Sequence, residues 1–282
     1  MLQGLSPEGV LSIQFRISAE FSSIHSLRTR FPKSACHPPA EGYDFSGSGA
    51  LSMKETIPPE KRRTGEILFC GISHGDPHCR EKILAFLGEY QPEIILLEVS
   101  PFALLFRLTL GRVYLALLRR RISRLGPSSP AGLENLIRYL SLPREYRAVQ
   151  EHCRKTRCRY RLVDSSLFSL LHLRKAHKIL SWENLRMHRE FREDPFQQER
   201  TMARRILQDG DDLLRKIKLD AFRRDDLLQR RERILIRRVG NELRRNPGKR
   251  LCYIGGWEHL MEDAEGCTLY SHWSRSRRRL II

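Results

Sequence analysis

A strand, glycine turn, helix and second strand over residues 67–98 constrain the fold of this chain most. The apolar run 67–70 ends in Gly71, helical periodicity follows, and the apolar run 94–97 closes the unit. Two strands joined through a helix are typical of a parallel pair. We therefore predict an α/β domain over about 65–282, with a mixed or mainly parallel sheet flanked by helices.

Polar residues follow these two strands at their carboxyl ends. His74 comes just after the glycine turn, and Glu98 comes directly after the second apolar run. Ligands of open parallel sheets gather at the carboxyl ends of the strands. We expect His74 and Glu98 to face one crevice.

Two later strands carry comparable residues. The apolar run 251–254 is followed by a second Gly-x-x-His turn that ends at His259. A weaker strand over 158–163 is followed by Asp164, which either joins the site or caps a helix beginning near Leu167.

A long, charged segment over about 167–245 has helical periodicity and predicts a basic helical subdomain. Apolar residues at three- and four-residue spacing form one seam, and the gaps in it fall on Arg224 and Arg231. A buried arginine left without an anionic partner costs roughly 3–5 kcal/mol. These two arginines either meet an anion or extend to solvent beside neighbouring carboxylates.

Basic residues dominate the composition, with 51 Lys and Arg against 33 Asp and Glu and a net charge of +18 over 282 residues. Such a balance favours anionic partners, although a solvated basic face explains it equally well. Nucleic acid is disfavoured because no reading module is recognisable. The stretch 102–125, apolar and then basic, predicts a helix that covers the sheet or lies on an anionic surface. Arg107 and Arg112 argue against a membrane span.

Residues 1–64 are rich in Ser, Pro and Gly and predict a disordered or non-native extension. Met53 is an alternative start, which leaves open whether residues 1–52 are translated. The seven cysteines form no CxxC motif, which favours a reducing compartment. We expect a cytoplasmic protein, with peripheral membrane contact and oligomeric state left open.

Histidines at two glycine turns and carboxylates at two strand ends have the composition of a metal site. A metal ion there would polarise a carbonyl group or lower the pKa of a bound water. The plainer alternative is that each histidine is an exposed or hydrogen-bonded turn residue.

With these motifs the sequence resembles the TraB/PrgY/GumN and Tiki-like family and, more distantly, the ChaN-like and erythromycin-esterase-like proteins. The resemblance spans about residues 66–273 and rests on Gly-x-x-His turns at 71–74 and 256–259 and a Pro-acidic strand at 91–98. A helix start with Glu145, a strand ending in Asp164 and the pair Arg231-Glu232 match further family features.

The chain also departs from the family pattern. Ala103 and Ser165 stand where the family has arginines, with Arg107 the nearest substitute for the first. The second turn carries a bulky Trp257 and an extra carboxylate at Glu258. These changes affect the residues expected to contact substrate more than they affect the histidine and carboxylate core.

The resemblance implies a metal-dependent hydrolase that cleaves a peptide amide or an ester. By correspondence, His74, Glu98 and His259 are the expected metal ligands or catalytic groups for Mn, Co or Zn, with Asp164 and Glu145 second. Arg231 would clamp a substrate carboxylate or hold Glu98 in place. The alternative is a non-catalytic module, either haem-binding like ChaN-like relatives or a signalling inhibitor, that uses the same crevice.

Overall fold

The computed structural model describes residues 67–125, 130–190, 195–273 and 276–282, so the extension predicted for 1–64 lies outside the described residues. Five described strands form one sheet in the order β3-β2-β4-β1-β5, and every pairing is parallel. The strands are β1 (Ile67–Ile72), β2 (Ile94–Leu97), β3 (Arg159–Leu162), β4 (Leu251–Gly256) and β5 (Arg277–Ile281). The predicted α/β fold is confirmed, and the described sheet is wholly parallel.

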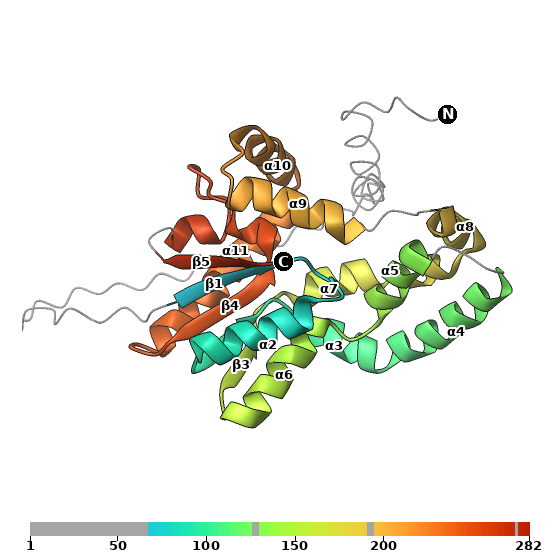
Figure 1. Ribbon diagram of the computed structural model, residues 1–282, viewed down its shortest axis with the longest axis horizontal. Coiled ribbons are helices and arrows are strands. Elements are labelled where there is room, and N and C mark those ends of the chain that lie inside the picture. The colour runs from blue at the N-terminus through green and yellow to red at the C-terminus, as the bar shows by residue number, and fades with distance from the viewer. Residues whose placement is uncertain (1–66, 126–129, 191–194, 274–275) are drawn as a thin grey trace, which may run out of the picture. The chain divides into compact units, whose positions relative to one another are not determined.

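One face of the sheet is covered by α2 (Cys79–Tyr90) and α6 (Arg144–Thr156), which lie side by side (Figure 1). Alternate strand residues such as Cys70, Leu97 and Ile254 point into this core. Helix α2 meets them with Ile83 and Leu87, which are four residues apart and therefore on one side of the helix.

The opposite face packs against α11 (Asp226–Arg245) and the short 3-10 helix η3 (Tyr270–Trp273). Leu235 and Val239 of α11 are fully buried against strand residues such as Phe69. Two further helices, α9 (Pro195–Leu207) and α10 (Asp212–Arg224), pack with the 3-10 helix η2 (Trp257–Leu260) that follows β4. Both faces of β1, β2 and β4 are thus buried, as a parallel sheet requires.

A separate core joins the remaining helices. Phe106, Leu118, Leu140 and Leu185 are among its buried side chains. The contributing elements are α3 (Pro101–Leu108), α4 (Leu110–Arg124), α5 (Pro130–Leu140), α7 (Ser166–Leu173), η1 (Ala176–Leu180) and α8 (Trp182–Glu190).

The single helix predicted for 102–125 is wrong, because the chain bends by 51° between α3 and α4. The break falls at Thr109, whose hydroxyl donates to the carbonyl oxygen of Leu105 (2.8 Å). Among the described residues no single helix is long and apolar enough to cross a membrane, although the bent pair meets both criteria together.

The continuous seam predicted across α10 and α11 is also wrong at its centre. Asp225 separates the two helices and caps α11, accepting hydrogen bonds from the backbone N–H groups of Leu227 and Leu228. The helical register restarts there, which leaves Arg224 exposed while Arg231 points inward.

Candidate functional site

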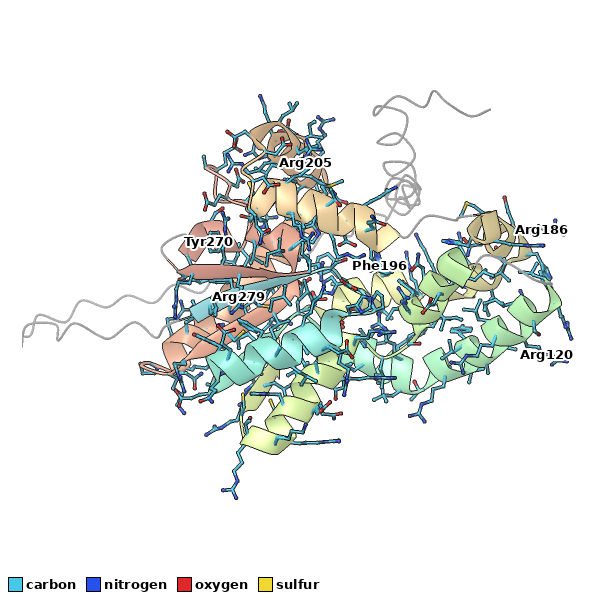
Figure 2. All side chains as sticks on the ribbon, viewed as in Figure 1. Arg120, Arg186, Phe196, Arg205, Tyr270 and Arg279 are labelled. Carbon is cyan, nitrogen blue, oxygen red and sulfur yellow. The ribbon has the colours of Figure 1, made fainter. Side chains whose placement is uncertain are left out.

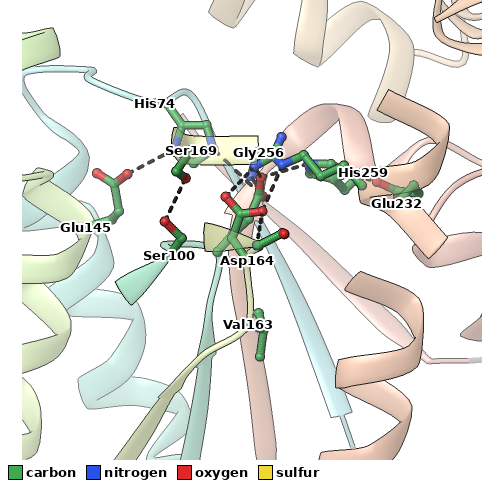
Figure 3. A network of polar contacts seen from close by, with 12 residues as sticks. His74, Ser100, Glu145, Val163, Asp164, Ser169, Glu232, Gly256 and His259 are labelled. Atoms are coloured by element: carbon green, nitrogen blue, oxygen red, sulfur yellow. Dashed lines mark hydrogen bonds and ion pairs between the residues drawn. The ribbon is translucent and has the colours of Figure 1, made fainter. Parts of the chain in front are cut away.

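The carboxyl edge of the sheet gathers four of the predicted site residues (Figure 3). Glu98 directly follows β2, Asp164 lies just beyond β3, and His74 and His259 come from the turns after β1 and β4. Since all the strands are parallel, these ends share one edge, and β4 lies between β1 and β2. The structure therefore brings together residues that are far apart in the chain.

Glu98 is the centre of this group, and its side chain is 1% exposed. Its Oε1 accepts from Arg231 Nη2 (2.6 Å) and lies 2.9 Å from His259 Nε2. Its Oε2 accepts from the Tyr253 hydroxyl (2.8 Å) and the Gly256 backbone N–H (2.7 Å). Although burial opposes the charged form, His259 and Arg231 hold the pKa of Glu98 well below its usual value.

Both histidines are oriented in the same way, each between a glutamate of its own and Glu98. Nδ1 lies 3.0 Å from Glu145 Oε1 in His74 and 2.5 Å from Glu232 Oε2 in His259. Nε2 of His74 lies 3.8 Å from Glu98 Oε2. Burial opposes protonation, but the paired carboxylates outweigh it: the pKa of His74 is raised well above its usual value and that of His259 to about 10. Both shifts favour the charged form of the imidazole.

Solvent reaches this cluster through His74. Its side chain is 45% exposed, whereas that of His259 is 8% exposed. Beside it, Oε2 of the buried Glu145 has no hydrogen-bond partner among the described residues. A solute approaching the edge would meet the His74 imidazole first, whereas the unpaired oxygen of Glu145 is buried.

Arg231 is committed to two carboxylates. Its Nε donates to Asp164 Oδ1 (2.9 Å), and its Nη2 donates to Asp164 Oδ2 (3.0 Å) as well as to Glu98. These contacts match the role of holding Glu98 in place rather than clamping a substrate. Asp164 does not cap α7, whose N-cap is Ser165; instead its Oδ1 accepts from the Ser165 N–H.

Three residues of the site were not predicted from the sequence as members of it. Glu232 and Tyr253 complete the hydrogen bonds around His259 and Glu98. Glu199 on α9 accepts from Trp257 Nε1 (3.1 Å), and burial, together with the charge of Glu258, raises its pKa. A signal existed for Glu232, a charged residue at helical spacing with Leu235 and Val239, which are both buried. We find none for Glu199.

The arginine substitute named from the sequence lies near the site. Arg107 donates through Nε to the carbonyl oxygen of Tyr139 (3.2 Å). Burial lowers its pKa, and electrostatic interactions with Tyr139 and Glu145 partly oppose that shift. A guanidinium is therefore within electrostatic reach of Glu145, although it comes from position 107 of α3 and not from position 103.

The three predicted metal ligands do not form a ligand set as they stand. A carboxylate has about four lone-pair positions, and those of Glu98 are taken by Arg231, His259, Tyr253 and Gly256. Within the described ranges, no group of three His, Cys, Asp or Glu side chains is placed to hold a metal ion. The divalent metal stays a prediction, and no chemical step below uses it.

Comparison of the chain with protein-family models, curated proteins and solved structures found no match. The TraB/Tiki-like resemblance accordingly stays a prediction.

Gly255→Ala tests whether the centre of the site depends on the missing side chain of that glycine. A Cβ there would overlap the Tyr253 hydroxyl and Glu98 Oε2. Displacing a buried, paired carboxylate should lower the free energy of unfolding by about 3 kcal/mol or more in urea denaturation. The matched control is Gly88→Ala, an exposed position in α2 with open space around it, which should raise stability by about 0.5–1 kcal/mol. Equal effects of the two substitutions would contradict this account.

Stability should depend on pH through His259. Its pKa is about 10 in the folded protein against 6.5 for the free side chain, so its contribution is complete below about pH 6.5 and is lost as pH rises to about 10. Each proton released gives a slope of about 1.4 kcal/mol per pH unit. His259→Gln should flatten the fall in unfolding free energy over this range, whereas the exposed-site control His177→Gln should not. An unchanged slope in His259→Gln would refute the assignment.

Proposed function

We propose that the chain is a hydrolase of amide or ester bonds, with its active site at the sheet edge around Glu98. The observation that carries this proposal is the paired arrangement of His74 and His259 on one buried carboxylate, each ring held by a second glutamate. Histidine rings oriented by carboxylates are a recurrent device for proton transfer. The TraB/Tiki-like resemblance supports the same reaction class.

His74 is the proton-transfer group in this proposal, because its raised pKa favours the acid form and its side chain is exposed. A solvent water attacks the carbonyl carbon and gives up a proton to neighbouring solvent as the new C–O bond forms. The leaving nitrogen or oxygen takes the proton of His74 as its bond to carbon breaks. Glu145 keeps the proton on Nδ1 of His74 through their contact (3.0 Å), and solvent returns a proton to Nε2 of the exposed ring.

The buried residues of the site set the charge that His74 experiences. Glu98, held by Arg231 and His259, keeps a fixed negative charge behind His74 and favours its protonated form. A fixed charge that does not reorganise during the reaction is an effective way to stabilise a transition state.

The substrate class that we favour is a peptide or a small molecule with an amide or ester bond. The haem-binding and signalling-inhibitor alternatives stay predictions, since no contact among the described residues favours either one.

His74→Gln should lower hydrolysis of a p-nitrophenyl ester or a quenched fluorescent peptide by about 100-fold or more, the usual contribution of acid–base catalysis. In the unchanged protein the rate should fall as pH rises through the elevated pKa of His74, because the acid form reacts. The variant should lose that limb of the pH profile. His78→Gln, an exposed position four residues further on, should retain full activity. Retained activity in His74→Gln would end the proposal.

Metal analysis tests whether the site binds the divalent ion that the family resemblance implies. A divalent ion bound by Glu98 would require the loss of some of its four hydrogen bonds. The metal-free proton transfer above predicts that purified protein carries no stoichiometric Mn, Co or Zn and keeps its activity after dialysis against a chelator. Stoichiometric metal that disappears in His74→Gln would instead establish a metal-dependent site.

A further inference from the structure

Large apolar side chains are exposed together on α3 and α4. Leu105, Leu110 and Val113 are 60%, 57% and 57% exposed, and Leu108 and Leu117 are 40% and 42% exposed. We call these five residues the α3–α4 face. The opposite sides of both helices are buried, with Phe106 and Leu118 in the core shared with α5 and η1. The pair therefore carries large apolar side chains on its outward side as well as on its buried side.

The same stretch carries only one sign of charge. Residues 99–133 contain six arginines and no Asp or Glu. Two of the arginines are used internally, since Arg107 donates to Tyr139 and Arg121 donates to the carbonyl oxygen of Leu180. The other four form no ion pair with any described carboxylate and are exposed: they are Arg112, Arg119, Arg120 and Arg124.

The apolar and basic groups share one side of α4. Val113, Leu117, Arg120 and Arg124 follow one another at spacings of four, three and four residues, which places them in a single row. Arg120 lies toward the C-terminal end of α4 (Figure 2). Leucines followed by arginines in one row match a surface with a hydrocarbon interior and anionic headgroups.

We propose that the α3–α4 face docks on an anionic membrane surface. Its leucines and valine enter the boundary between headgroups and acyl chains, and Arg120 and Arg124 of the same row contact lipid phosphates and carboxylates. The helices lie on the membrane and do not cross it, because they bend by 51° and bury one side in the protein. Trp182 of α8, 41% exposed and stacked 5.7 Å from Arg121, adds the kind of aromatic residue that favours the interface.

Vesicle flotation of the full chain tests this proposal without reference to hydrolysis. The vesicles are phosphatidylcholine alone or with about 30% phosphatidylserine, which gives a negative surface potential. We expect binding to the anionic vesicles at least about tenfold tighter, and weakened by added salt.

Two double variants separate the apolar from the basic contribution. Arg120→Gln with Arg124→Gln should weaken binding about thirty-fold, because each arginine near an anionic surface is worth about 1 kcal/mol. Val113→Ser with Leu117→Ser should weaken it by about tenfold or more at unchanged charge. The matched controls are Arg233→Gln with Arg237→Gln on α11 and Leu213→Ser on α10, all exposed positions that should bind like the unchanged protein.

Circular dichroism and urea midpoints verify that every variant is folded, as its exposed positions lead us to expect. Absence of binding, equal binding to neutral vesicles, or loss in the control variants to the same degree would each overturn the proposal. Unchanged vesicle binding in Arg120→Gln with Arg124→Gln would also overturn it. If that variant at the same time lost affinity for a single-stranded RNA, the two arginines would be assigned to nucleic acid and not to lipid.

Discussion

The buried charge of Glu98 is the constraint on which this structure depends. A carboxylate that is 1% exposed is tolerated only if its lone pairs are satisfied and its charge is balanced. The necessary donors come from α11, β4 and η2, which supply Arg231, Tyr253, Gly256 and His259. The Glu98 carboxylate thereby fixes the positions of two strands, a helix and the turn after β4.

The strand order makes this convergence geometrically available. β4 lies between β1 and β2, so the turn after β4 sits between His74 and Glu98. Two small residues end β4: Gly255 leaves room for Glu98 Oε2 and the Tyr253 hydroxyl, and a Cβ at Gly256 would lie 3.2 Å from His74 Nε2. The close approach of these groups requires backbone without side chains.

The electrostatics of this edge differ from those of the whole chain. The protein carries +18, yet the carboxylates here outnumber the cations even when both imidazoles are protonated. That local excess raises the pKa values of His74 and His259, and it would favour an acid form at neutral pH. Part of the overall positive charge lies elsewhere, on exposed arginines of α4, where it suits a separate role at an anionic surface.

The sequence by itself determined the α/β class, the positions of four strands and the placement of His74, Glu98 and His259 at strand ends, because apolar runs and glycine turns are local properties. It did not reveal β5, a basic edge strand whose exposed arginines hide the usual apolar alternation. Only the tertiary structure decided that α3 and α4 separate at Thr109 and that Glu199 and Tyr253 join the cluster. Those outcomes depend on how strands are ordered and how helices pack against them, and contacts between distant segments leave no periodic signal in the chain.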